Sequence, residues 1–343
     1  MDKNKYLYIY ADIFFTRGYN RTMMLNLKDN TWHFITNDFY DTILLFKYNT
    51  IDYVLNKNPY NVNVQSLIDY FLNNQLASIV DDLSLFPPIQ QKWYSPHIIE
   101  NAIIDIDIES KHDYRKIAIE LEELLCRNIQ FRLYTTMALD NLEDILSNFI
   151  NKDFSSIDVL IKYDSSITPK DYLLLAKKYP SVSFVVHTSP LSSFHESLLK
   201  DVYPIVGYVQ FIKQEIFSSD CCGIINNCSM VHPNNVHDYM EGVLRNKCLN
   251  KKISIDTKGN IKNCPSMKHI YGNIKHSSLI DVCKNKSFRS YWYLNKEKIK
   301  ICKDCEYRNV CNDCRAFIKN KYEKPLKCNY NPYNLSWDNE KQT

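Results

Sequence analysis

The sequence has little glycine, no long hydrophobic run and no excess of charge of either sign. Its 343 residues include 6 glycines, so no glycine-rich loop of the kind that cradles phosphate is visible. There is no run of eighteen or more apolar residues, and residues 1–5 do not begin a signal peptide. The net charge is +3, with basic and acidic residues interleaved, which disfavours nucleic-acid binding. We therefore expect a cytoplasmic protein with neither a nucleic-acid nor a membrane partner.

What remains is the composition of a folded globular protein. Hydrophobic residues make up 45% and charged residues 24% of the chain, far from the composition of disordered proteins. The length is sufficient for two or three domains with a substantial core. We expect an α/β protein with boundaries near residues 85 and 217.

Residues 1–85 predict a small module of strands followed by short helices. An apolar segment at 6–10 precedes a hairpin with arms at 21–27 and 31–35. A helix begins near Thr36 or Asn37, either of which can cap it. A second helix has an apolar face made of Leu67, Ile68, Phe71, Leu72 and Leu76. This order is typical of a winged-helix-like module, and a plain α+β subdomain is the alternative.

Residues 86–217 follow a Phe-Pro-Pro break and alternate between strand-like and helix-like patterns. The expected strands are 102–106, 129–133, 157–161, 182–186 and 205–211. The expected helices contain residues 117–125, 142–149 and 172–176, the last with a start signal at Thr168 and Pro169. Repeated strand–helix units predict a parallel sheet, either open or a partial (β/α) barrel.

Residues 218–343 contain eleven of the twelve cysteines. Strands at 252–255 and 260–262, joined by a turn with Gly259, form a hairpin that brings Cys248 and Cys264 together. Further on, the pattern is C-x2-C-x5-C-x2-C, followed after thirteen residues by a last cysteine. Because cytosolic thiols stay reduced, metal ligation explains these cysteines better than disulfides. Iron–sulfur clusters and a pair of four-thiolate zinc sites both use such spacings.

The ordered cysteines resemble the SPASM domain, an auxiliary module that holds two [4Fe–4S] clusters in many radical-SAM peptide maturases. The resemblance assigns one cluster to Cys302, Cys305, Cys311 and Cys328. It assigns the other to Cys248, Cys264 and Cys314, with a fourth ligand upstream. The candidates for that ligand are Cys221, Cys222 and Cys228, of which Cys222 is preferred. The last two clustered cysteines are separated by two residues here, whereas three is usual in the family. Cys126 and Cys283 are expected to be buried, unpaired thiols on helices.

Over nearly its whole length the chain resembles the grasp-with-spasm system SPASM domain peptide maturases. The stretches that carry this resemblance are 101–107, 222–225, 248–256, 259–267, 302–308, 311–316 and 324–333. The resemblance implies that a precursor peptide, an ATP-grasp ligase and this protein act together. It also implies that the N-terminal module recognises the precursor's leader, which would add as a strand beside the hairpin.

The sequence has no C-x3-C-x2-C triad, the motif through which a radical-SAM cluster binds S-adenosylmethionine. We therefore expect a degenerate radical-SAM-like middle segment that does not use this cofactor. The motifs do not imply whether the protein itself catalyses a step. A non-enzymatic adaptor between precursor and ligase, with zinc or clusters as structural sites, is the alternative.

A third interpretation places a new active site in the middle segment. Asp105 and Asp107 lie two apart at a strand end, where they could form an acid pair or a metal site. His187 ends a similar strand and is more often structural in such a place. Arg132 and Lys162 could bind an anionic group, or could equally form salt bridges to Asp105 or Asp158.

Overall fold

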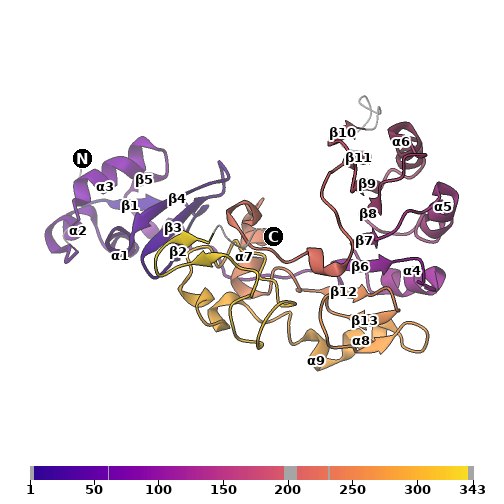
Figure 1. The fold of residues 1–343 in the computed structure, drawn as a ribbon. Helices are drawn as coiled ribbons and strands as arrows, with labels where there is room; N and C mark the ends of the chain where they lie inside the picture. Colours follow the sequence, from indigo (N-terminus) through magenta and orange to yellow (C-terminus); the bar gives the residue numbers. More distant parts are fainter. Residues whose placement is uncertain (1–3, 61, 197–206, 231, 339–343) are drawn as a thin grey trace.

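A computed structural model describes residues 4–60, 62–196, 207–230 and 232–338. It shows a mixed α/β protein with one large, mainly parallel sheet. In Figure 1 the N-terminal elements lie at one end, the large sheet lies at the other, and the C-terminal segment runs between them. Among the described helices, none has the length and apolar character that a membrane span requires.

The N-terminal elements form two small sheets with three helices. The strands are β1 Tyr6–Ile9, β2 Ile13–Arg17, β3 Arg21–Asn26, β4 Thr31–Thr36 and β5 Ala77–Val80. The helices are α1 Asn37–Phe46, α2 Ile51–Lys57 and α3 Val64–Asn73. The predicted hairpin is confirmed, since β3 and β4 pair antiparallel. The sequence did not indicate β2, which completes the order β2-β3-β4, or β5, which pairs with β1.

Local chemistry explains where these helices begin. The Thr36 hydroxyl accepts a hydrogen bond from the amide of Phe39 and caps α1, as predicted. The buried side chains of α3 include Leu67, Ile68 and Phe71, which pack into the core of the N-terminal elements. Leu76 lies beyond the end of α3 and therefore was wrongly included in that helix.

The large sheet has nine strands in the order β10-β11-β9-β8-β7-β6-β12-β13-β14. Its strands are β6 Asn101–Ile106, β7 Asn128–Leu133, β8 Ser156–Lys162, β9 Val182–His187, β10 Ser193–Glu196, β11 Tyr208–Phe211, β12 Lys252–Ile255, β13 Asn260–Lys262 and β14 Gly272–Asn273. Its connecting helices are α4 Tyr114–Glu123, α5 Leu139–Ser147 and α6 Pro169–Lys178. The pairs β6·β7, β7·β8 and β8·β9 are parallel, as predicted, and the sheet is open.

Two features of the sheet differ from expectation. Strand β10 pairs antiparallel with β11 at one edge, and the predicted strand at 205–211 begins at Tyr208, with residues 205–206 outside the described part. At the other side β12 pairs parallel with β6, so the cysteine-rich segment continues the sheet. The predicted hairpin of β12 and β13 is confirmed. Thr168 and Asp171 form a capping box at the start of α6.

The rest of the C-terminal segment consists of short elements joined by loops. These are η2 Ser219–Cys221, η3 Asn227–Ser229, α7 Val236–Leu244, α8 Leu279–Lys284, α9 Lys286–Arg289, η4 Lys296–Lys298, η5 Cys302–Asp304, β15 Tyr330–Asn331 and β16 Ser336–Trp337, with η1 Leu83–Leu85 further upstream. Cys283 is buried on α8, whereas Cys126 is buried in the loop after α4 and not on a helix. With so little regular structure, this segment depends on side-chain contacts for its shape.

Candidate metal centres

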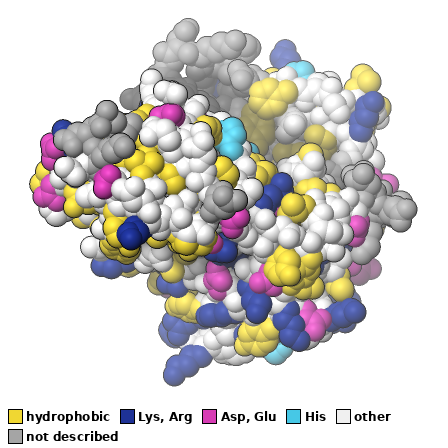
Figure 2. Space-filling view, turned by 90° about the vertical axis from the view of Figure 1, so that its left-hand side faces the viewer, with side chains coloured by type: hydrophobic (Ala, Val, Ile, Leu, Met, Phe, Trp, Pro, Cys, Tyr) yellow, Lys and Arg dark blue, Asp and Glu magenta, His cyan; other side chains and the backbone are white. Residues whose placement is uncertain are grey.

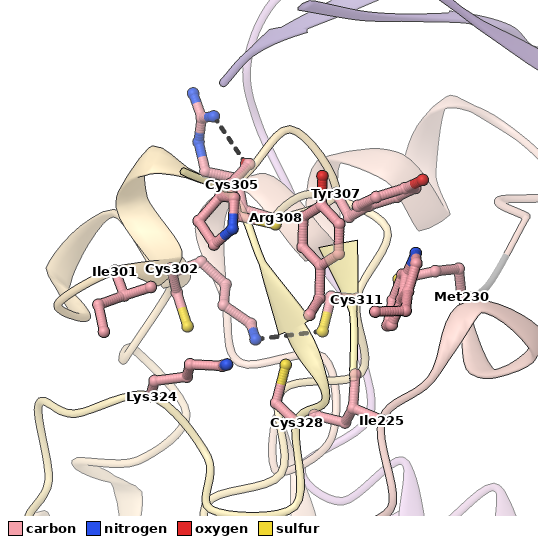
Figure 3. Close-up of a pocket in the computed structure, with 14 residues that line it drawn as sticks. Ile225, Met230, Ile301, Cys302, Cys305, Tyr307, Arg308, Cys311, Lys324 and Cys328 are labelled. Carbon is pink, nitrogen blue, oxygen red and sulfur yellow. Dashed lines mark hydrogen bonds between the residues drawn. The ribbon is translucent and has the colours of Figure 1, made fainter. Parts of the chain in front are cut away.

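Four cysteines from three separate turns line one pocket. They are Cys302, Cys305, Cys311 and Cys328, the set that the resemblance assigned to a single cluster. Figure 3 shows the sulfur atoms of Cys302, Cys311 and Cys328 directed toward the same space. Four thiolates are the donor set that iron–sulfur clusters use, so these residues fit such a group.

Backbone hydrogen bonds hold these cysteines in place. The amide of Cys305 donates to the carbonyl of Cys302 over 3.1 Å, which closes the turn between the first two. Cys328 forms a parallel β-bridge with Ile225, over one hundred residues upstream, and the amide of Ile225 donates to the carbonyl of Lys327. The last ligand of the set is therefore positioned by the segment that follows the cysteine pair at 221 and 222.

Burial favours the neutral thiol form at three cysteines of this set. Burial raises the pKa of Cys302 to about 11, and it raises the pKa values of Cys305 and Cys328 as well. Thiolates, not thiols, bind metals, so metal binding here must release protons. Because the buried thiols resist deprotonation, we expect this set to hold only a metal group that binds thiolates tightly.

The second predicted set gathers around the hairpin of β12 and β13. Burial, together with Cys248, raises the pKa of Cys264 to about 12. Burial, Cys248 and Cys222 likewise raise the pKa of Cys314, to about 11. Cys248 therefore lies near both Cys264 and Cys314, and Cys222 lies near Cys314. That these four residues form one ligand set stays a prediction.

The other two upstream candidates have different surroundings. Burial is the main cause of the raised pKa of Tyr134, which follows β7, and Cys221 lies close enough to contribute to it. Cys228 is exposed, and its thiol lies 3.3 Å from the side-chain oxygen of Asn227. Within the described residues, no three histidine, cysteine, aspartate or glutamate side chains close on a point as the ligands of one metal ion would.

Gly223 lets the backbone approach the second set closely. Its φ is +90°, and a Cβ atom there would lie 2.8 Å from the sulfur of Cys314 and 2.8 Å from the ring of Phe317. We expect Gly223→Ala to lower the iron bound by about half, because it displaces Cys314, a predicted ligand of one of the two expected clusters. Iron and sulfide assays on the purified variant measure this.

Gly259→Ala is the matched control for Gly223→Ala. Gly259 also has a positive φ, +83°, but a Cβ atom there would meet Ile274 and Asn273 and no sulfur. It should cost comparable stability through backbone strain while iron binding is kept. Full iron in Gly223→Ala, or equal losses in the two variants, would contradict the role given to Gly223.

The residues considered for a new active site have structural partners. Asp105 forms a buried ion pair with Arg132, with 2.7 Å between Oδ1 and Nε, and accepts a hydrogen bond from Tyr134. Asp107 lies past the end of β6, where its carboxylate accepts hydrogen bonds from the hydroxyl of Ser110 and the amide of Glu109. The two aspartates therefore serve a salt bridge and a turn, with no shared partner among these contacts.

His187 and Lys162 lie opposite each other on neighbouring strands, β9 and β8. The imidazole of His187 is buried, with Nε2 3.0 Å from the carbonyl oxygen of Leu133 and Nδ1 3.0 Å from the hydroxyl of Thr188. Burial lowers the pKa of His187. Both ring nitrogens have partners, so this histidine helps to hold the strand ends together.

Sequence reasoning missed the basic residues at the cysteine sets. Lys296 lies 3.1 Å from the sulfur of Cys311, and Lys252 lies 3.9 Å from the sulfur of Cys248. The dashed line to Cys311 in Figure 3 marks the first contact. Lys252 precedes a strand-like run, and Lys296 lies in a turn among other lysines. Neither position carries a local signal of its role.

Residues 247–306 match the family model of the SPASM domain, an iron–sulfur cluster-binding domain. This chain carries a SPASM domain. The matched residues contain four of the eight cysteines, namely Cys248, Cys264, Cys302 and Cys305. The remaining four, including the pair with the shortened spacing, lie outside the matched part.

No curated protein matches this chain by sequence. Among solved structures, Streptococcus suis SuiB bound to S-adenosylmethionine is 12% identical, with a TM-score of 0.38 over 94% of this chain and 99% of that one. The same protein bound to precursor peptide SuiA is 10% identical, with a TM-score of 0.35 over 90% and 96%. TM-scores this low do not establish a common fold, so the SPASM match of residues 247–306 alone carries the assignment of the domain.

Proposed function

We propose that this protein takes part in the maturation of a ribosomally synthesised peptide, together with an ATP-grasp ligase. In this proposal residues 1–85 bind the leader of the precursor, 86–217 form a degenerate radical-SAM-like α/β part, and 218–343 hold two [4Fe–4S] clusters. The proposal is supported chiefly by the SPASM match of residues 247–306 and by the pocket that Cys302, Cys305, Cys311 and Cys328 line together. The first set would supply a redox-active or anchoring group through its thiolates.

The N-terminal sheet offers an edge beside the first cysteine set. Among the described strands, β4 pairs with β3 alone, which leaves its other edge available for an added strand. The ring of Trp32 on β4 stacks on His232 at 3.7 Å, and Phe34 packs edge-on against Tyr307. A leader bound at β4 would therefore lie next to the segment that carries Cys305.

The surface around these elements suits a peptide of mixed polarity. Figure 2 views the molecule from the side of the N-terminal elements, and hydrophobic side chains lie there among uncharged ones. Lys and Arg side chains gather in the lower part of this view. Main-chain hydrogen bonds at the strand edge would supply affinity, and apolar contacts would supply selectivity.

Hydrogen–deuterium exchange with the cognate precursor peptide tests the leader site. We expect amide exchange at Thr31–Thr36 to slow severalfold when the peptide is bound, because a new strand protects the free edge of β4. Exchange at Ala77–Val80, on the separate sheet of β1 and β5, should not change. A peptide that binds without protecting β4, or that protects β5 instead, would exclude this site.

The adaptor remains the second candidate because the sequence contains no C-x3-C-x2-C triad. A pure adaptor needs the cysteine sets only as structural centres. The two candidates differ when ligase, ATP and precursor are combined with this protein under reducing and oxidising conditions. A product that forms only in one redox state of the clusters supports a redox role. A product that forms equally well under both conditions supports the adaptor.

A further inference from the structure

The first cysteine set contains a buried lysine that points at one of its sulfurs. Lys296 is 5% exposed, and its ammonium lies 3.1 Å from the sulfur of Cys311 and 3.2 Å from a carboxylate oxygen of Asp313. Lys296 is therefore one half of a buried ion pair that lies against the cysteine set.

The charges around Lys296 do not cancel without an anion at the cysteines. Asp313 is 1% exposed and forms a second ion pair, 2.9 Å long, with the buried guanidinium of Arg315. One carboxylate thus serves two cations, which leaves one positive charge in excess. Glu306, beside Cys305, does not supply the balance, because Arg21 pairs with it. An uncompensated buried cation is costly, and the sulfur of Cys311 is the group placed to carry the missing negative charge.

The second set repeats this arrangement in a weaker form. Lys252 is half-buried, and its ammonium lies 3.9 Å from the sulfur of Cys248. Across the part of the chain that the structure describes, the ion pairs found do not include Lys252. Each four-cysteine set therefore has a lysine in contact with one of its sulfurs.

We propose that Lys296 and Lys252 set the reduction potentials of the clusters held by their own cysteine sets, with Lys296 the stronger of the two. This inference rests on the two-cluster part of the proposed function. Each lysine acts on its cluster through the sulfur beside it: Lys296 through Cys311 and Lys252 through Cys248. Both are therefore positioning residues and not ligands. Hydrogen bonds and charges at ligand sulfurs are among the factors that fix cluster potentials.

The physical reason is the change of charge on reduction. A [4Fe–4S]²⁺ cluster with four thiolates has a net charge of about −2, and one electron from an external donor makes it about −3. No bond forms or breaks in this step. A fixed cation stabilises the reduced state more than the oxidised one, and more so in a low-dielectric interior. Lys296 is closer to its sulfur and more deeply buried than Lys252, so its effect is the larger.

Anaerobic redox titration with dithionite, followed by electron paramagnetic resonance, tests the inference. We expect Lys296→Met to lower the equilibrium constant for reduction of one cluster at least tenfold, a shift of about 59 mV for one electron. Lys252→Met should lower the potential of the other cluster by less. Lys298→Met is the matched control, since Lys298 lies in the same turn but is exposed and bonds to the carbonyl of Tyr293. It should leave both potentials unchanged.

Iron and sulfide assays separate a failure of this inference from a failure of the proposed function. Wild-type protein without iron and sulfide would refute the two clusters themselves, and the inference with them. Clusters present in every variant, with equal potentials in Lys296→Met and Lys298→Met, would overturn the inference alone.

A second pair of variants keeps the test decisive if Lys296→Met does not hold its cluster. Lys296→Arg keeps the positive charge and should keep the wild-type potential, whereas Lys296→Gln keeps a donor without the charge and should lower it. Equal potentials in these two variants would overturn the role assigned to the charge of Lys296.

Discussion

Cys311→Ser is expected to remove about half of the bound iron and sulfide and to destabilise the C-terminal segment. Cys311 is one of four cysteines around a single pocket, so its loss should disable one of the two proposed clusters. The change also removes the sulfur next to Lys296, which then keeps only Asp313, a carboxylate shared with Arg315. Because metal binding contributes folding free energy, the loss should appear as a lower midpoint of unfolding. Metal assays and denaturant unfolding under anaerobic conditions measure both effects.

Cys283→Ala is the control for this prediction. Cys283 is also a buried cysteine, but it packs into the apolar core on α8 and belongs to neither set. Its replacement should keep all of the iron and lower stability only by the cost of a small cavity. Full iron in Cys311→Ser, or an equal loss in Cys283→Ala, would contradict the assignment of the first set.

Arg21→Ala is expected to lower the free energy of unfolding by about 3 kcal/mol, near the lower end for a broken buried ion pair. The guanidinium of Arg21, on β3, donates to Glu306 over 2.7 Å, and the carboxylate of Glu306 is 1% exposed. The phenol of Tyr330 donates to the same oxygen, and Arg21 also lies 3.6 Å from the ring centre of Phe34. Without Arg21 a charged carboxylate remains buried beside Cys305. The side chain of Arg21 is 25% exposed, which moderates the cost.

Arg17→Ala provides the comparison for Arg21→Ala. Arg17 lies on the neighbouring strand β2 and pairs with Asp41, with 46% of its side chain exposed. An exposed pair contributes about 0–1 kcal/mol, so this variant should unfold almost as the wild type does. Adding Glu306→Gln to Arg21→Ala should recover part of the lost stability by removing the buried charge. Denaturant unfolding in which the two arginine variants have equal stability would refute the role given to the pair of Arg21 and Glu306.

The large sheet was predictable where each strand is a local apolar run. β6 to β9 are short apolar runs that alternate with amphipathic helices, so their pattern is readable within a short window. The pairing of β12 with β6 was not predictable, because it joins residues about 150 positions apart and depends on the whole arrangement. Strand β5 was hidden for a similar reason, since its partner β1 lies at the start of the chain.

The cysteine sets could be proposed from spacing and resemblance, because their members are few and of one type. The charged residues around the cysteine sets could not be predicted in this way. Lys296 contacts Cys311 and Asp313, which lie fifteen and more residues further along the chain. The chain is rich in lysines, and nothing in the sequence distinguishes Lys296 from the others. The sequence offered Asp105 both as an acid pair with Asp107 and as a salt-bridge partner of Arg132, and only the pairing of β6 with β7 decides for Arg132.

The central claim is that the eight cysteines hold two iron–sulfur clusters. Anaerobic purification followed by quantitation of iron, acid-labile sulfide and zinc tests it most directly. Two [4Fe–4S] clusters predict about eight iron and about eight sulfide per chain, with little zinc. Stoichiometric zinc without sulfide would show that the same thiolates hold structural zinc instead, and would contradict the account.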